Sequence, residues 1–195
     1  MSGVTFGEWL RNSKLSFLLE FEFWLLCLGI FVVLSFFSFG YHKRISALEQ
    51  TTNQAWSDVE VQLKQRQDIV PKLIVAFEDY TANENVTLKK VVDARQATLN
   101  ADGVQSTAVA EARLSQALGE LFTLADSYPD LAASQNFLQL QDELANTENK
   151  ISASRRFHNN AVGEYNTIFE QLPEKLVVKL FGFKKREIFE TSQLQ

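Results

Sequence analysis

Three charged or titratable side chains interrupt an otherwise apolar heptad pattern late in the sequence. Glu148, Arg155 and His158 occupy the two seam positions of this pattern, where the other residues are mostly leucine, isoleucine, valine, tyrosine and phenylalanine. Glutamate and histidine often serve as general acid and base, so the group could form a small hydrolytic site. The pattern offers one histidine and no neighbouring nucleophile, which makes this catalytic interpretation the weaker one.

The same residues suit a structural role better. Buried charges are costly unless they are paired, and the middle of the first long helix offers Asp58 and Arg66 as partners. An Asp58–Arg155 pair or a Glu148–Arg66 pair would fit two antiparallel helices. We therefore expect a buried polar layer that fixes helix register, made of Asp58, Arg66, Glu148, Arg155 and His158. No catalytic, cofactor-binding or metal-binding residue is predicted. Cys27 is the only cysteine, and the two histidines are far apart.

The elements that must position this layer are helices. Apolar residues spaced three or four apart predict helices over about 41–83, 84–99, 107–127 and 134–172, and no useful strand-like alternation is present. Pro71 predicts a kink or break near residues 68–70. Ser134 is a candidate N-cap, and Pro173 is expected to stop the last long helix. The expected fold is all-α, an elongated antiparallel bundle of about four helices over residues 42–172.

An uncharged run of about 18 residues, Phe23 to Gly40, precedes the bundle. A membrane-spanning helix needs about 20 mostly apolar residues, so we predict a transmembrane helix over residues 23–41. Lys43 and Arg44 favour a cytoplasmic body by the positive-inside bias, whereas Arg11 and Lys14 on the other flank oppose it. We lean towards a cytoplasmic body at the bacterial inner membrane, with the periplasmic alternative open.

Both ends of the chain mix aromatic and basic residues. Residues 1–22 form a leader that is either an interfacial amphipathic helix or loosely ordered, and residues 173–195 form a basic, aromatic tail. Aromatics in that tail could instead cover the end of the bundle. The residues expected at the membrane surface are Trp9, Trp24, Lys43, Arg44, Lys184, Lys185 and Arg186. The net charge of −5 argues against a generic nucleic-acid binder.

Several long segments resemble the LemA family. They are residues 55–64 with Arg66 and Pro71, residues 128–131, 136–141, 143–144 and 147–149, and then Ile151, 155–157, Asn159, Val162, 165–166 and 182–183. The resemblance spans about residues 41–190. It implies a single N-terminal membrane anchor and an antiparallel helical bundle, and no established activity, substrate or cofactor. It also implies that these motif residues are helix-contact and register positions.

Taken together, the residues favour a membrane-anchored, non-enzymatic helical scaffold that self-associates. Its partners would be the lipid bilayer and further copies of the chain, which makes a homo-oligomer. One alternative is an adaptor that docks a membrane protease or transport complex through a tip at residues 80–85 and 100–105. A remote alternative is a hydrolase that uses Glu148, Arg155 and His158.

Overall fold

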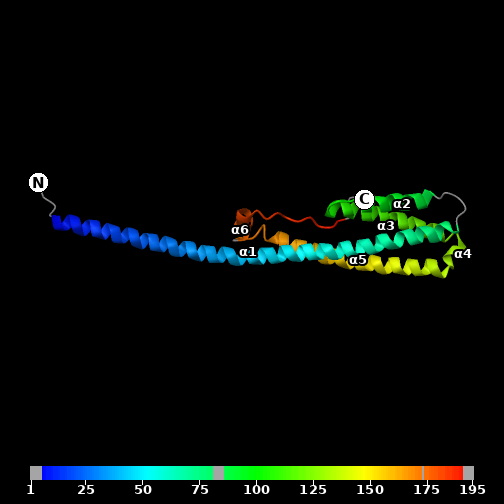
Figure 1. The fold of residues 1–195 in the computed structure, drawn as a ribbon, viewed down its shortest axis with the longest axis horizontal. Coiled ribbons are helices and arrows are strands. Elements are labelled where there is room, and N and C mark those ends of the chain that lie inside the picture. The colour runs from blue at the N-terminus through cyan, green and yellow to red at the C-terminus, as the bar shows by residue number, and fades with distance from the viewer. Residues whose placement is uncertain (1–5, 81–85, 173, 191–195) are drawn as a thin grey trace.

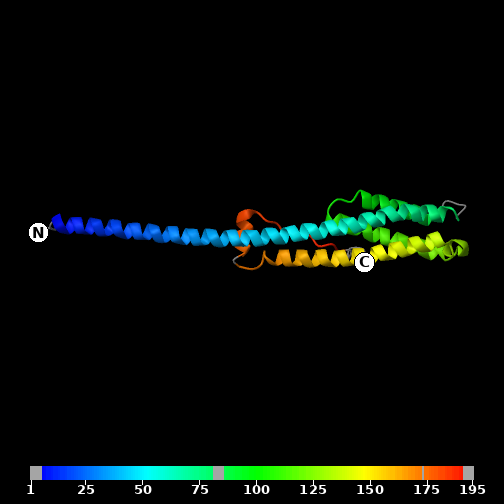
Figure 2. The same cartoon turned by 60° about the horizontal axis from the view of Figure 1, so that its bottom comes forward.

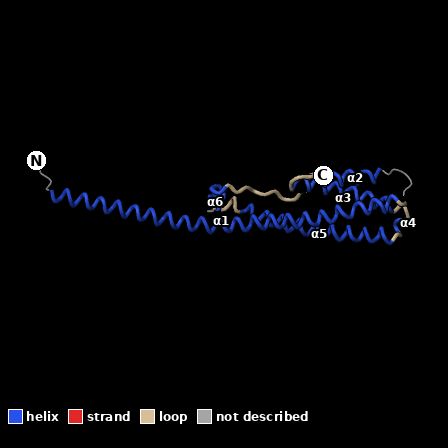
Figure 3. Tube along the Cα trace, in the orientation of Figure 1, coloured by secondary structure: helices blue, strands red, loops and turns tan. Residues whose placement is uncertain are grey.

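The computed structural model describes residues 6–80, 86–172 and 174–190. Within α1 it leaves out the side chains of residues 6–23, 27, 30, 33, 34, 36 and 37. The described chain consists of helices, turns and loops without strands (Figure 3), which confirms the all-α prediction. The helices are α1 (Phe6–Glu78), α2 (Val86–Leu99), α3 (Val104–Ala125), α4 (Pro129–Ala132), α5 (Gln135–Thr167) and α6 (Glu174–Phe181).

The helix α1 is the longest helix of the described chain. Its 73 residues make it about 110 Å long at 1.5 Å per residue. Its C-terminal part packs side by side with the antiparallel α5, whereas its N-terminal part extends beyond the other helices (Figures 1 and 2). The bundle therefore occupies one end of an elongated molecule.

The helices α2 and α3 form a second antiparallel hairpin beside the far half of the α1–α5 pair (Figure 1). Because α2 has only 14 residues, the chain returns about 20 Å before it turns into α3. Val104 at that turn packs near Trp56, beside Val59 in the middle of the rod. The turn at residues 100–105 thus lies away from the tip that the adaptor hypothesis assigned to it, and residues 81–85 lie outside the described chain.

Buried apolar residues gather in three clusters along the rod. The largest fills the far half, where all four bundle helices contribute, and it is built around Val70, Leu73, Phe77, Leu114 and Leu121. A middle cluster contains Val59, Leu63 and Ile151, and a third lies beside α6 and includes Ile45 and Tyr165. Each cluster joins α1 to α5, which explains why these two antiparallel helices lie side by side along their shared length.

The structure corrects two predicted boundaries. Of the kink or break expected near residues 68–70, the break is wrong, because α1 runs through Pro71 to Glu78. The helix α5 ends at Thr167, five residues earlier than predicted, because the next backbone N–H groups bond three residues back and tighten the chain into turns. Ser134 has extended backbone at the N-cap position without a side-chain capping bond. Pro173 lies outside the described residues.

The predicted transmembrane segment, residues 23–41, is part of α1, and so are residues 6–22 of the leader. Within the part of the chain that is described, no helix is both long and apolar enough to cross a bilayer.

Candidate functional site

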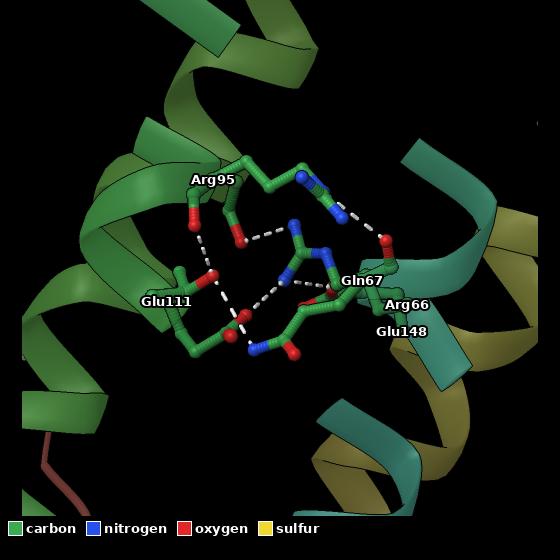
Figure 4. A network of polar contacts seen from close by, with 7 residues as sticks. Arg66, Gln67, Arg95, Glu111 and Glu148 are labelled. Carbon is green, nitrogen blue, oxygen red and sulfur yellow. Dashed lines mark hydrogen bonds and ion pairs between the residues drawn. The ribbon is translucent and has the colours of Figure 1, made fainter. Parts of the chain in front are cut away.

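Arg66 is the centre of a buried polar layer in the bundle. Its side chain is nearly inaccessible, and its guanidinium contacts two other helices (Figure 4). The Nη1 atom lies 3.1 Å from Glu148 Oε2 on α5 and 3.3 Å from Glu111 Oε2 on α3. The Nη2 atom donates to Ser115 Oγ on α3 at 2.8 Å. One side chain therefore ties α1 to both of these helices.

Glu111 is the most perturbed acid of this layer. Its side chain is buried, and burial raises its pKa from 4.5 to about 7, although the nearby guanidinium of Arg66 opposes that rise. The Glu148 carboxylate, which is half exposed, raises the pKa of Glu111 further because two negative charges repel each other. Two carboxylates and one guanidinium thus share a site in which the protonation of Glu111 balances the charge.

The carbonyl group that Pro71 leaves without its helical partner is satisfied by a neighbouring helix. In a regular α-helix the N–H of residue 71 would donate to the carbonyl of Gln67, but proline has no N–H. Arg95 Nε on α2 donates to Gln67 O at 3.3 Å instead (Figure 4). The Gln67 amide also donates to Thr98 Oγ1 at 3.3 Å. This substitute hydrogen bond explains how α1 passes a proline without a break.

The predicted polar layer is divided in the structure. The Glu148–Arg66 pair is present, whereas Asp58 is exposed, Arg155 is half-buried, and no ion pair joins the two among the described residues. Asp58 precedes the buried Val59, so it points away from the face that α1 presents to α5. His158 lies ten residues after Glu148, about 15 Å along α5. The proposed catalytic trio therefore does not gather at one point.

The layer contains members that the sequence analysis missed. Glu111 and Ser115 on α3 complete the contacts of Arg66. Glu111 follows the inward Ala108 by three positions and precedes the inward Leu118 by seven. That spacing places a carboxylate on an apolar helix face, and it was the available signal.

His158 belongs to a second site, in the middle of the rod. Its ring is buried, lies 5.3 Å from the ring of Trp56, and has Nδ1 3.3 Å from Asn159 Oδ1. Burial lowers the pKa of His158, and the Asn159 contact partly offsets that effect. A cavity of about 80 Å³ lies against it, lined by Thr52, Asn53, Trp56, Val104, His158, Val162, Arg186 and Glu187.

The C-terminal segment closes this second site. Residues 183–190, which we call the strap, follow α6 without regular secondary structure and run back along the bundle (Figure 1). Asn166 Nδ2 donates to Arg186 O at 2.9 Å, and Asn166 Oδ1 accepts from Arg186 N at 2.9 Å. Asn159 holds Phe189 in the same way, with bonds of 3.0 and 2.8 Å. Two asparagine amides thus clamp the strap backbone onto α5.

Side chains of the strap add specific contacts. The Phe189 ring is buried, lies 5.9 Å from the ring of Trp56, and completes the middle apolar cluster. Arg186 Nη2 lies 2.7 Å from Glu49 Oε1 on α1, and Lys185 Nζ lies 3.0 Å from Glu170 Oε1. The asparagines were noted in the sequence only as helix-contact positions. Their seven-residue spacing, which puts both on one helix face, was the overlooked signal.

The residues predicted at the membrane surface have different environments. Trp24, Lys43 and Lys184 are exposed, and Arg44 lies 3.6 Å from Glu174 on α6. Lys185 and Arg186 make the ion pairs described above. The side chain of Trp9 lies outside the described residues.

A large apolar surface lies at the end of the bundle that faces the N-terminal part of α1. Trp24 is 71% exposed and Phe31 is 69% exposed on α1. On α6, Val177 and Val178 are buried against the bundle while the opposite side remains open. The exposed apolar residues are Trp24, Leu25, Leu26, Leu28, Phe31, Val32 and Phe39 on α1, with Leu172, Leu176, Leu180 and Phe181 in and before α6. Large exposed apolar side chains in such number are typical of surfaces that contact a partner or a membrane.

Metal chemistry has no evident location in the described ranges. No three histidine, cysteine, aspartate or glutamate side chains of residues 6–80, 86–172 and 174–190 come together as a possible set of metal ligands.

Comparison with known proteins identifies relatives along most of the chain. A family model described as LemA family matches residues 55–195. Protein LemA of Metamycoplasma hominis is 27% identical over 178 residues, which is 89% of this chain and 78% of that protein. Magnetosome protein MamQ of Magnetospirillum gryphiswaldense is 25% identical over 80 residues, which is 41% of this chain and 29% of that protein. Neither name specifies a reaction.

Proposed function

Since this chain belongs to the LemA family, we propose that it is a helical scaffold, anchored in the bacterial inner membrane, that self-associates there. The observation that carries the proposal is the exposed apolar surface of α1 beyond the bundle, with Trp24, Leu28 and Phe31 all more than 60% exposed. A run of large exposed apolar side chains of this kind is typical of a surface that contacts lipid or another protein. The uncharged run from Phe23 to Gly40 is where an anchor would lie.

The helix α6 supports the same proposal. Leu172, Leu176 and Leu180 recur at four-residue spacing, and the first and last of them are more than 70% exposed. Lys175 and Lys179 are also exposed on this short helix. A helix with one apolar stripe and flanking lysines fits the interface of an anionic bilayer. It would lie beside the point where α1 leaves the membrane, with the body extending from there on the cytoplasmic side.

A scaffold fits the remaining structure better than a hydrolase. Glu148 is paired with Arg66, and His158 is packed against Trp56. Glu148 and His158 therefore take part in different packing contacts, and this leaves the proposed catalytic trio without a common site.

Anchoring is tested by carbonate extraction of membranes from cells that express the full chain. We expect the wild-type chain to remain with the membranes. Replacing Phe31 and Val32 together with lysine should release it, because each charge near the middle of a bilayer costs about 3 kcal/mol. Replacing Val61 and Val75 together with lysine provides the matched control. These valines are similarly exposed but lie on the bundle part of α1. A wild-type chain that extracts as readily as the lysine variant would refute anchoring.

Self-association is tested separately, by measuring the mass of the full chain in lipid nanodiscs or mild detergent. A dimer or larger assembly is expected, and a strictly monomeric chain would refute this part of the proposal. Chemical crosslinking in native membranes distinguishes the adaptor alternative. A series of products made only of this chain favours the scaffold, whereas one dominant product with a different protein favours the adaptor.

A further inference from the structure

The strap is held in a way that would suit any extended peptide. Asn159 and Asn166 lie seven residues apart on α5, which corresponds to about 10.5 Å along the helix. The residues that they clamp, Arg186 and Phe189, lie three apart, and three residues of extended chain span about 10 Å. The two spacings match, so each amide meets the N–H and C=O of one strap residue.

These four hydrogen bonds involve backbone atoms of the strap, so they fix its direction and register without selecting its sequence. Selection comes from two anchors. Phe189 fills an apolar pocket beside Trp56, and Arg186 pairs with Glu49. The groove between α1 and α5 therefore has the two parts of a peptide site: backbone recognition, and side-chain contacts for an arginine, through a surface ion pair, and for a buried aromatic residue three positions later.

We propose that this groove is an exchangeable peptide site, in which the strap of a second copy replaces the chain's own strap. The proposal deepens the proposed function and rests on it, because it assigns the contact through which the scaffold would self-associate. A second copy carries the same sequence, so exchange would recreate every hydrogen bond, ion pair and ring contact of the closed form. Exchange of identical elements is a low-cost route to dimers for this reason.

The local structure of the strap favours exchange. The strap leaves α6 at Gly182, whose φ of 75° lies in the region that glycine adopts without strain. Residues 183–190 lack regular secondary structure and contact the bundle through side chains of α1 and α5 and, at Glu190, through Gln105 of α3. Copies anchored in one membrane by α1 would also hold their grooves at equal height, so both straps could exchange about a two-fold axis.

The test places one half of the Glu49–Arg186 contact on each of two copies. One copy carries Glu49→Cys and the other Arg186→Cys, with different tags, both in the full chain with Cys27→Ser. A short bismaleimide crosslinker is then applied to membranes that contain both copies. Exchange predicts a crosslinked product that carries both tags. A copy with both cysteines must also crosslink, within one chain or between two, and its failure to do so would refute the observed strap contact and with it the proposal.

A matched pair controls for random collision. Lys90 on α2 and Glu120 on α3 also form a surface ion pair, at 2.6 Å, but lie far from the strap. Lys90→Cys and Glu120→Cys on separate copies should give little product with both tags. If their yield equals that of the Glu49/Arg186 pair, exchange is refuted. An oligomer that lacks the 49–186 product refutes exchange and leaves self-association standing, whereas a monomeric chain refutes the proposed function itself.

A peptide provides a second, independent measurement. The probe is a fluorescent peptide with the sequence of residues 183–190, added to the full chain. A tethered strap competes at an effective concentration in the millimolar range, so the wild-type chain should bind the probe weakly. Phe189→Ala weakens the chain's own strap and should increase probe affinity by about tenfold or more. Adding Asn159→Ala should abolish that gain, whereas Asn160→Ala, an exposed neighbour, should not. No binding by the Phe189→Ala chain would overturn the proposal.

Discussion

At the scale of single residues, Arg66 is the buried charged side chain on which the polar layer depends. It pairs with Glu111 and Glu148 on two different helices. Removing one partner of such a group leaves an uncompensated buried charge, which costs more than the pair itself contributes. The layer is therefore better understood as a requirement for the correct assembly of α1, α3 and α5 than as a source of stability.

The first prediction concerns this asymmetry. Arg66→Met should lower the free energy of unfolding by about 3–5 kcal/mol at pH 8, because Glu111 then remains buried without its cation. Adding Glu111→Leu should recover a large part of the loss. Lys90→Met, at the exposed Lys90–Glu120 pair, should cost much less, because solvent screens an exposed ion pair. Urea unfolding followed by circular dichroism measures all three, and equal losses for Arg66→Met and Lys90→Met would contradict the buried layer.

The second prediction is a pH dependence. The pKa of Glu111 is raised from 4.5 to about 7, so its proton binds more tightly in the folded state. The resulting stability is fully present below about pH 4.5 and is lost as the pH rises through 7. Glu111→Gln stays neutral, so between pH 4.5 and 8 the wild type should lose up to about 3 kcal/mol more than the variant. Urea unfolding across this range measures the difference.

The titration of His158 does not affect the comparison between the wild type and Glu111→Gln. Its lowered pKa acts in the opposite direction, because its contribution is present above about pH 6.5 and is lost as the pH falls. The wild type and Glu111→Gln share this residue, so its effect cancels in their difference. Parallel pH profiles for the two proteins would show that Glu111 has an ordinary pKa.

At the scale of elements, the helices were predictable from the regular spacing of their apolar residues. The contacts between a side chain and a distant backbone group were not. The apolar spacing indicated α2, α3 and α5 to within a few residues, and it placed Glu148 opposite Arg66. The role of Asn159 was harder to foresee, because an asparagine that binds a distant backbone leaves no apolar periodicity, and its seven-residue spacing from Asn166 was the one signal available. Pro71 misled for a related reason: its effect depends on Arg95, a residue of a different helix.

The third prediction tests that dependence. Arg95→Ala should destabilise the wild-type chain by about 1–3 kcal/mol, since it removes the donor to a carbonyl that has no helical partner. Pro71→Ala restores an N–H that can bond Gln67 within the helix, so Arg95→Ala should cost clearly less in that background. A double-mutant cycle of unfolding free energies isolates the coupling. Equal costs in both backgrounds would mean that Arg95 does not replace the missing bond.

At the scale of the whole molecule, the design is a rod with its interaction surfaces arranged in order along one helix. The exposed apolar residues 24–39 of α1 come first, then the level of α6, then that of the strap, and finally the polar layer and the main apolar cluster. Under the proposed function, membrane attachment, self-association and stability would be assigned to successive lengths of the same chain. Changes at one level should have little effect on the others.

The fourth prediction is a distance across most of the bundle. Spin labels at Lys43→Cys and Glu78→Cys, both exposed positions on α1, should lie about 52 Å apart with a narrow distribution, because 35 residues of unbroken helix separate them. Pulsed electron paramagnetic resonance on the Cys27→Ser chain provides the measurement. A broad or much shorter distribution would indicate that α1 bends at Pro71. The same labels in Pro71→Ala serve as the straight-helix reference.

The unbroken course of α1 has a consequence for how the chain tolerates changes in length. In a continuous helix, the number of residues between two positions determines both their separation along the axis and the angle between them about the axis. Arg66 lies 26 positions beyond Gly40, or about 39 Å. Deleting one residue between them would bring Arg66 about 1.5 Å closer to Gly40 along the helix axis. It would also rotate Arg66 by about 100° about that axis relative to Gly40, which would misalign the polar layer with α5. Deleting seven would nearly restore the angle. Length changes in this stretch are therefore expected to be tolerated in multiples of seven, and only with a matching change in α5.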